Sequence, residues 1–248
     1  MQYTLLSILP EDRNAILILV LTTASLGFII WYYLASSLRL PVRYQIMYDA
    51  NPPYVNRIFR RRVTGFLIYG AIPLFLLMCT KMFGKPSLVD LNISFQWNQE
   101  VMWYTLGGVL FVLLFSWRTT KQRSSLEQFP EVRIRFWRPS IFILSSLYWI
   151  LYITAYEFFY RGLLFQSLLT AFNSEAVAVV GCTALYCLSH YFKLNRISIA
   201  SIFYGAIACI VVLKTGSLIP TIVAHTASSL FVEWFSIRHH REMFILRT

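Results

Sequence analysis

Four ionisable side chains lie within apolar stretches of the sequence: Glu157, Arg161, His190 and His225. Ionisable groups are costly in hydrocarbon, and those that a membrane protein keeps there mark a functional site by default. Carboxylates and imidazoles transfer protons, and Glu157, His190 and His225 are also the ligand types of a catalytic zinc centre. The sequence therefore predicts a site inside the membrane that serves catalysis, metal binding or ion movement.

The spacing of these residues bears on the alternatives. Glu157 and Arg161 lie one helical turn apart and can pair, which leaves open a purely structural clamp between helices. The two histidines come from two other segments, without the close histidine pair that makes a zinc motif specific. We therefore expect no cofactor, and a zinc ion held by Glu157, His190 and His225 is the minor alternative. Transport is less favoured, because the paired Gly- or Pro-broken helices of transporters are not evident.

Seven apolar segments can carry these residues through a bilayer, since one crossing takes about 20 helical residues. The fourth is too long for one upright crossing, so we expect it to be tilted, broken or protruding. The sequence predicts an all-α polytopic membrane bundle of about seven transmembrane helices, in a single domain over residues 1–248. The segments are 15–35, 63–83, 101–117, 141–169, 176–192, 197–213 and 218–237.

The composition supports a membrane protein. Hydrophobic residues make up 57% of the 248 residues and charged residues 13%, whereas a soluble domain has roughly a quarter charged residues. The net charge is +11, but the basic residues gather between the apolar segments, where they set membrane orientation. We expect the N-terminus outside and the C-terminus in the cytoplasm, with the lipid bilayer as a partner and no nucleic acid.

Three short motifs follow one another along the second half of the chain. EFFYRGLL begins at Glu157, YCLSH ends at His190, and IPTIVAHTASSL contains His225. Together they resemble the motifs of the CPBP family of intramembrane proteases, which includes the Abi proteins and the type 2 CAAX prenyl proteases. That family has Glu-Glu-x-x-x-Arg, Phe-x-x-x-His and His-x-x-x-Asn on successive membrane helices. The resemblance covers a core at about 139–237, whereas the helices within 15–117 agree in topology only.

The resemblance implies an all-helical protease that hydrolyses peptide bonds with an activated water. Glu157 and Arg161 match the family's second glutamate and its arginine. His190 matches the histidine that activates water together with a glutamate, and His225 matches the histidine that helps to hold the oxyanion. Ser229 stands where the family has its asparagine, so the implied catalytic residues are Glu157, Arg161, His190, His225 and Ser229.

Two positions depart from the family pattern. Tyr156 replaces the first glutamate, which is usually assigned as the general base, and a tyrosine with a pKa near 10 is a poor base at neutral pH. Adjacent helical residues point about 100° apart, so Glu157 can take over only if the helix rotates or breaks near Tyr156. The change to Ser229 is milder, because a hydroxyl still donates one hydrogen bond, although with shorter reach than an amide.

We therefore predict a CPBP-type intramembrane endopeptidase that hydrolyses a membrane-associated protein or peptide. The alternative is a catalytically inactive protein of the same fold that acts as a binding partner or scaffold subunit in a membrane complex, and Tyr156 favours it.

Two further expectations concern the ends of the helices. Glu233 lies two turns beyond His225, and we expect it to pair with Arg238 or His239 at the membrane surface. The segments NPPYVNRIFRRR and FPEVRIRFWRP mix arginines with aromatic residues, and we expect both to lie on anionic headgroups.

Overall fold

The computed structural model describes residues 10–36, 52–82, 91, 93–126, 128–190 and 195–246. Across these ranges the chain is a helical bundle with one short pair of parallel strands, which confirms the predicted all-α fold. The elements are α1 (Pro10–Ser36), α2 (Pro52–Phe66), the π-helix η2 (Leu67–Ala71), α3 (Ile72–Met82), α4 (Gln99–Thr119), α5 (Arg123–Leu126), β1 (Phe136–Trp137), α6 (Pro139–Glu157), the π-helix η3 (Phe158–Leu164), α7 (Phe165–Phe172), α8 (Glu175–Leu188), α9 (Asn195–Thr215), α10 (Ile219–His239) and β2 (Phe244–Ile245).

Four of the described helical stretches are long and apolar enough to cross a membrane, which agrees with an integral membrane protein of several spans. Two shorter helices, Glu175–Leu188 and Ile199–Thr215, are also apolar. The total of seven crossings and the side of the membrane on which each terminus lies stay predictions. The four stretches are Asn14–Trp31, Val55–Cys79, Gln99–Thr119 and Pro139–Phe172.

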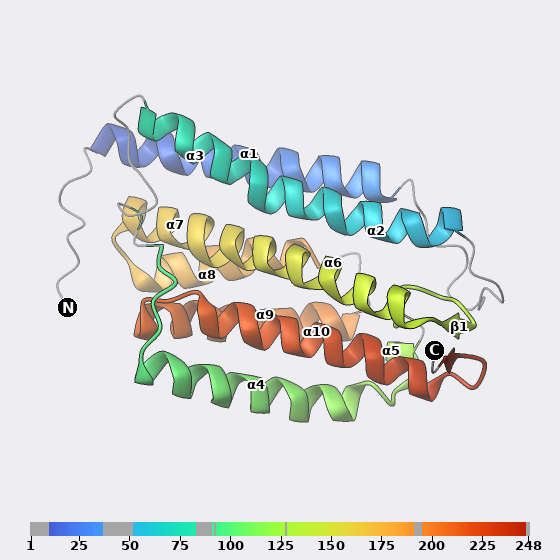
Figure 1. Ribbon diagram of the computed structural model, residues 1–248. Helices are drawn as coiled ribbons and strands as arrows, with labels where there is room; N and C mark the ends of the chain where they lie inside the picture. Colours follow the sequence, from blue (N-terminus) through green and yellow to red (C-terminus); the bar gives the residue numbers. More distant parts are fainter. Residues whose placement is uncertain are drawn as a thin grey trace.

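The longest stretch, Pro139–Phe172, runs through the middle of the bundle as α6, η3 and α7 in 34 residues. Figure 1 shows α1, α2 and α3 along one side of it, with α9, α10 and α4 along the other. α6 packs against α2 and α10, α7 packs against α1 and α8, and α4 packs on α10. The segment that was predicted to be too long is thus one helical rod whose regular winding is interrupted by η3.

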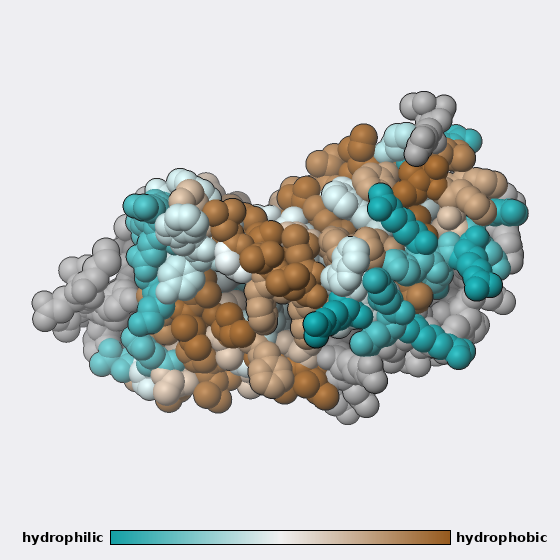
Figure 2. Space-filling model, turned by 90° about the horizontal axis from the view of Figure 1, so that it is seen from below, coloured by the Kyte–Doolittle hydropathy of each residue, from teal (hydrophilic) through white to brown (hydrophobic). Residues whose placement is uncertain are grey.

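The outer face formed by α4 is apolar. The side chains of Trp103, Leu110 and Phe111 are exposed there. Figure 2, which looks at the bundle from this side, shows hydrophobic surface over the middle of the face and hydrophilic residues gathered toward its two ends. Lipid tails cover the middle of a membrane protein and headgroups its ends, so this distribution fits a chain embedded in a bilayer.

Local signals in the sequence account for several helix ends. Asn98 caps α4, because its Oδ1 accepts the main-chain N–H of Val101 at 2.8 Å. Pro139 stands at the start of α6, where a proline costs no hydrogen bond. Asn173 ends α7 in the left-handed conformation, with φ of 48°. The tight turn after it directs α8 back along α7, which it contacts.

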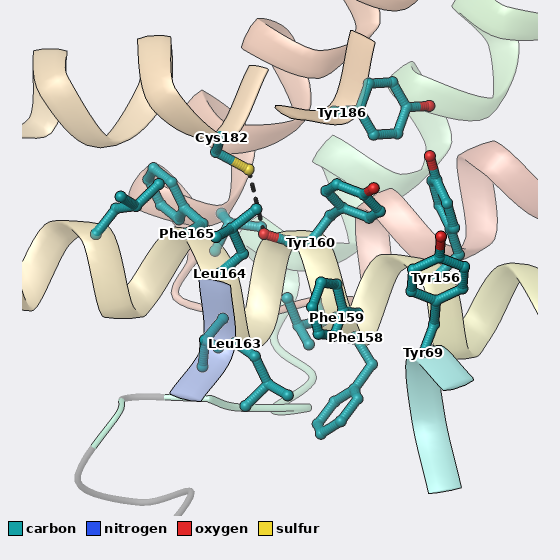
Figure 3. Packing of buried hydrophobic residues seen from close by; sticks show 14 of the residues in the cluster. Tyr69, Tyr156, Phe158, Phe159, Tyr160, Leu163, Leu164, Phe165, Cys182 and Tyr186 are labelled. Carbon is teal, nitrogen blue, oxygen red and sulfur yellow. Dashed lines mark hydrogen bonds between the residues drawn. The ribbon is translucent and has the colours of Figure 1, made fainter. Parts of the chain in front are cut away.

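All seven residues of η3 are buried, and the centre of the main hydrophobic core contains five of them, Phe158, Phe159, Tyr160, Leu163 and Leu164. Figure 3 shows them together with Tyr69 from η2 and Tyr186 from α8. Gly70 permits η2 to approach this region closely, because a Cβ there would lie 2.8 Å from the Cβ of Ala155. Aromatic side chains from three elements therefore meet where α6 gives way to η3.

A second, smaller core lies at the end of the bundle that carries β1. It joins apolar residues of α2 to the segment that precedes α6. The apolar side chains of these two arginine-rich segments thus pack against each other, and the position of the segments on headgroups stays a prediction. The buried members are Val55, Ile58, Phe59, Val132, Ile134, Trp137, Ile237 and Met243.

Candidate active site

The helix that carries Tyr156 and Glu157 is irregular directly after Glu157, where the sequence predicted that it must rotate or break if Glu157 is to serve as the base. Glu157 is the last residue of α6, and η3 begins at the next residue. A π-helix closes its hydrogen bonds over five residues rather than four, so it changes the direction in which neighbouring side chains point. Both Tyr156 and Glu157 are buried in the bundle, so neither of the two adjacent side chains is turned outward.

Glu157 reaches across the bundle to α10. Its Oε1 lies 2.5 Å from Nδ1 of His225. Because an ionised carboxylate only accepts hydrogen bonds, Nδ1 carries the proton and Nε2 is left as the basic nitrogen. The Glu157 side chain is fully buried, whereas 16% of the His225 side chain is exposed. The basic nitrogen of this pair therefore belongs to the more accessible partner.

Arg161 pairs with the same glutamate, as its spacing predicts. Its Nε lies 3.4 Å from Oε2 of Glu157, and both side chains are fully buried. The guanidinium carbon also lies 4.0 Å from the ring centroid of Tyr186 and 5.4 Å from that of Tyr204. Within the described residues, however, none of the three guanidinium nitrogens has a hydrogen-bond acceptor, and Oε2 has no donor. Charge attraction and aromatic stacking hold this arginine.

His190 lies just beyond the end of α8, in a group of polar side chains. Its Nδ1 is 3.0 Å from the main-chain oxygen of Tyr186, so this nitrogen must carry the proton. The Ser189 hydroxyl donates to the same oxygen at 2.6 Å. The Tyr156 hydroxyl is hydrogen-bonded to Ser189 Oγ and lies 3.4 Å from His190 Nδ1.

The three motifs therefore meet at Tyr156. Its ring centroid is 6.0 Å from that of His190 and 6.2 Å from that of His225. The irregular helix allows Tyr156 and Glu157 to approach both the residues at the end of α8 and His225 on α10. The pairing differs from the one that the resemblance implies, because Glu157 contacts His225 and the neighbour of His190 is Tyr156.

Ser229 lies one turn beyond His225 on α10, as predicted. In the described part of the chain it forms no hydrogen bond to the residues around Tyr156, and its role in holding an oxyanion stays a prediction. No three His, Cys, Asp or Glu side chains among the described residues are grouped so that they could hold a metal ion. The arrangement of Glu157, His190 and His225 therefore gives no support to the zinc alternative.

Glu233 is buried inside the bundle, and the expectation that it pairs with Arg238 or His239 is wrong. It is fully buried, and its Oε1 lies 3.1 Å from Nη2 of Arg62 on α2. Its Oε2 accepts the main-chain N–H of Glu131 at 3.0 Å. Arg62, from the arginine-rich segment at the start of α2, thus lies inside the bundle, where the Glu233 carboxylate balances its charge.

Sequence reasoning missed two groups of residues. One is the Arg62 network, whose members come from α2, α6, α10 and the segment before β1; only an arginine inside an amphipathic run hinted at it. The other is the contact of Tyr156 with Ser189 and His190. Its sequence cue was present, since Tyr156 stands at a family glutamate position and Ser189 precedes the histidine of YCLSH.

Comparison with protein-family models identifies the region that carries the site. Residues 137–231 match the family described as type II CAAX prenyl endopeptidase, Rce1-like. This match agrees with the resemblance to the CPBP family and includes Glu157, Arg161, His190 and His225. No curated protein and no solved structure gave a significant match to the chain.

Proposed function

Because residues 137–231 match the family described as type II CAAX prenyl endopeptidase, Rce1-like, we propose that this membrane protein is an active intramembrane endopeptidase. The observation that carries the proposal is the contact of 2.5 Å between Glu157 Oε1 and His225 Nδ1. It supplies a base that does not depend on a carboxylate at position 156.

In this mechanism His225 activates the water. The carboxylate behind Nδ1 fixes the tautomer and stabilises the imidazolium that forms when Nε2 takes a proton. The water oxygen bonds to the peptide carbonyl carbon, and the carbonyl electrons move to the oxygen. As the tetrahedral intermediate collapses, the C–N bond breaks and the His225 proton passes to the leaving nitrogen.

Arg161 supports the pair through its charge. A buried arginine stays protonated, so it balances the ionised Glu157 while His225 is neutral. Two charges close together in a poorly solvated site interact more strongly than they do in water. Arg161 is therefore a positioning residue in this scheme, and it keeps the carboxylate in the form that His225 needs.

The substrate that we propose is a membrane-associated protein or peptide, because the site lies within an apolar bundle. The charge bias supports a cytoplasmic C-terminus. Arg57 and Arg60 of α2 are exposed at the end of the bundle where this helix begins. A substrate anchored in the bilayer can approach from the membrane without first entering water.

A second candidate function is supported by Tyr156. A protein of this fold that lacks the first glutamate can bind a membrane-associated partner without cleaving it, as a scaffold subunit would. In that case Glu157, Arg161 and His225 would form a buried clamp between helices. The two functions differ in one consequence, which is whether a covalent bond in another membrane protein is broken.

The experiment compares the N-termini of membrane proteins in host cells that carry the wild-type protein, a deletion, Glu157→Gln or His225→Gln at matched abundance. We expect a set of N-termini that disappears in the deletion and in both variants. His225→Gln leaves the Glu157–Arg161 pair intact, so it remains informative if Glu157→Gln does not fold. Unchanged N-termini in the deletion would reject the endopeptidase, and proteins that copurify with the chain would then identify the scaffold function.

A further inference from the structure

Tyr156 occupies the middle of the site. It is 4% exposed, and its ring stands nearly perpendicular to those of His190 and His225, at 80° and 78°. Its hydroxyl faces the polar group formed by Ser189 and His190. Figure 3 shows the Tyr156 side chain extending from α6 toward Tyr186 on α8. The residue at this position is therefore part of the cluster in which the motifs meet.

The hydrogen bonds around Tyr156 determine the direction of its own. The Ser189 proton goes to the main-chain oxygen of Tyr186, and so does the proton on His190 Nδ1. Both of these donors are thus in use. In the bond between Tyr156 and Ser189, the proton must then come from Tyr156, with Ser189 Oγ as the acceptor.

This donor can be redirected at little cost. When the Tyr156 hydroxyl turns to another acceptor, Ser189 keeps the bond that it donates and loses only one that it accepts. Tyr204, the other tyrosine close to His225, is directed elsewhere. Its hydroxyl donates to the main-chain oxygen of Thr221 at 3.1 Å, on the helix that carries His225.

We propose that Tyr156 is a catalytic residue. Its hydroxyl donates a hydrogen bond to the oxyanion that forms when the activated water attacks the peptide carbonyl. The inference rests on the proposed function. A tyrosine keeps its proton at neutral pH, which makes it a poor base and a suitable donor. Position 156 thus supplies a proton donor, and the carboxylate of Glu157 serves the base.

The donor takes part in the reaction without changing its balance. His225 Nε2 takes the water proton, the new C–O bond forms, and the carbonyl oxygen becomes negative. Tyr156 turns its O–H from Ser189 to this oxygen and keeps the proton throughout. When the C–N bond breaks and the carbonyl reforms, the hydroxyl returns to Ser189. Removal of one oxyanion donor lowers kcat by about a hundredfold to a thousandfold.

The test uses the full-length protein with Tyr156→Phe, which removes only the hydroxyl. Tyr152→Phe is the matched control, because Tyr152 lies one turn earlier on α6, with its ring centroid 5.7 Å from that of Tyr156. Glu157→Gln reports on the base. A peptide that spans a cleavage junction found only in wild-type membranes serves as the substrate for kcat and KM, and thermal unfolding monitors folding.

We expect Tyr156→Phe to lower kcat by about a hundredfold or more, with KM close to the wild-type value and Tyr152→Phe unaffected. If Tyr156→Phe keeps the wild-type kcat while Glu157→Gln is inactive, Tyr156 is not the donor, although the endopeptidase stands. Equal losses in Tyr156→Phe and Tyr152→Phe would also overturn the inference, since they indicate packing. If wild-type membranes contain no specific cleavage product, the proposed function itself fails.

Discussion

Arg62 and Arg161 are both buried in the bundle and both face a buried glutamate, but their surroundings differ. Arg62 donates hydrogen bonds from all three of its nitrogens, to Glu131, Glu233 and Ser145. Arg161 lies 3.4 Å from Glu157 and donates none to a described residue. The two clusters thus contain the same ion pair with opposite degrees of hydrogen-bond satisfaction.

The difference separates a structural role from a chemical one. A buried charge whose donors are all used stabilises one arrangement, and removal of its partner leaves an uncompensated charge. The Arg62 network in this way fixes α2 and the segment before β1 onto α6 and α10. The Glu157 cluster keeps unused donors and a basic nitrogen on His225, so it can interact with a substrate. Its four ionisable residues also lie inside the matched region 137–231, whereas Arg62, Glu131 and Glu233 lie outside it.

The largest expected effect is that of His225→Gln on the rate of cleavage. The substitution removes the proposed base and preserves the Glu157–Arg161 pair. We expect kcat to fall about a thousandfold or more, with a small change in stability because the side chain is partly exposed. The measurement is single-turnover cleavage with thermal unfolding as the control. A variant that folds and keeps the wild-type rate would remove His225 from the mechanism.

The next effect compares the two arginines. Arg62→Gln removes the charged partner of the Glu131 and Glu233 carboxylates. We expect it to lower the free energy of unfolding by about 3–5 kcal/mol. Arg161→Gln should cost less, because it breaks no hydrogen bond among the described residues. Denaturant unfolding in detergent gives both values. A larger loss for Arg161→Gln would contradict the contrast between the clusters.

Two serines test the same contrast on a smaller scale. Ser145 Oγ accepts from Arg62 Nη1 at 2.8 Å, so Ser145→Ala should lower the free energy of unfolding by about 1 kcal/mol. Ser229→Ala should leave stability close to wild type, since Ser229 has no hydrogen bond to the described site. The same unfolding experiment measures both. Equal losses would show that Ser229 has a structural partner.

The smallest expected effect is the contribution of His240, which lies outside the membrane-spanning segments, to the pH dependence of stability. Burial lowers the pKa of His240 below its ordinary value, and the neutral ring donates from Nε2 to the main-chain oxygen of Phe129 at 2.9 Å. The unfolded chain therefore binds this proton first as the pH falls, and stability decreases below the ordinary histidine pKa of about 6.5. Unfolding at several pH values should show a weaker acid dependence in His240→Gln. Identical slopes would exclude this contribution.

Much of the helical framework follows from the sequence. The predicted segment 15–35 corresponds to α1, 101–117 to α4 and 218–237 to α10, with ends that agree within a few residues apart from the start of α1. Apolar runs of sufficient length define such helices almost without reference to tertiary contacts. The Glu157–Arg161 pair also followed from spacing alone, because a helix brings side chains four residues apart together.

The remaining features depend on contacts between distant segments. Spacing along one helix cannot reveal that Glu157 meets His225 on α10 or that Arg62 meets Glu233 on the same helix. The second helix begins at Pro52 rather than at residue 63, because the apolar side chains of this amphipathic start are buried against the segment before α6. An irregular helix near Tyr156 was predicted to be necessary for Glu157 to serve in the site, but no local residue type indicates that a π-helix begins after Glu157.

The role of Glu157 is tested most directly by the cleavage rate per folded molecule of two matched variants, Glu157→Gln and Glu233→Gln. Both replace a fully buried glutamate that pairs with a buried arginine. We expect Glu157→Gln to lower the rate per folded molecule at least about a hundredfold, whereas Glu233→Gln lowers only the amount of folded protein. Equal rates per folded molecule in the two variants would contradict the assignment of Glu157 to the chemistry.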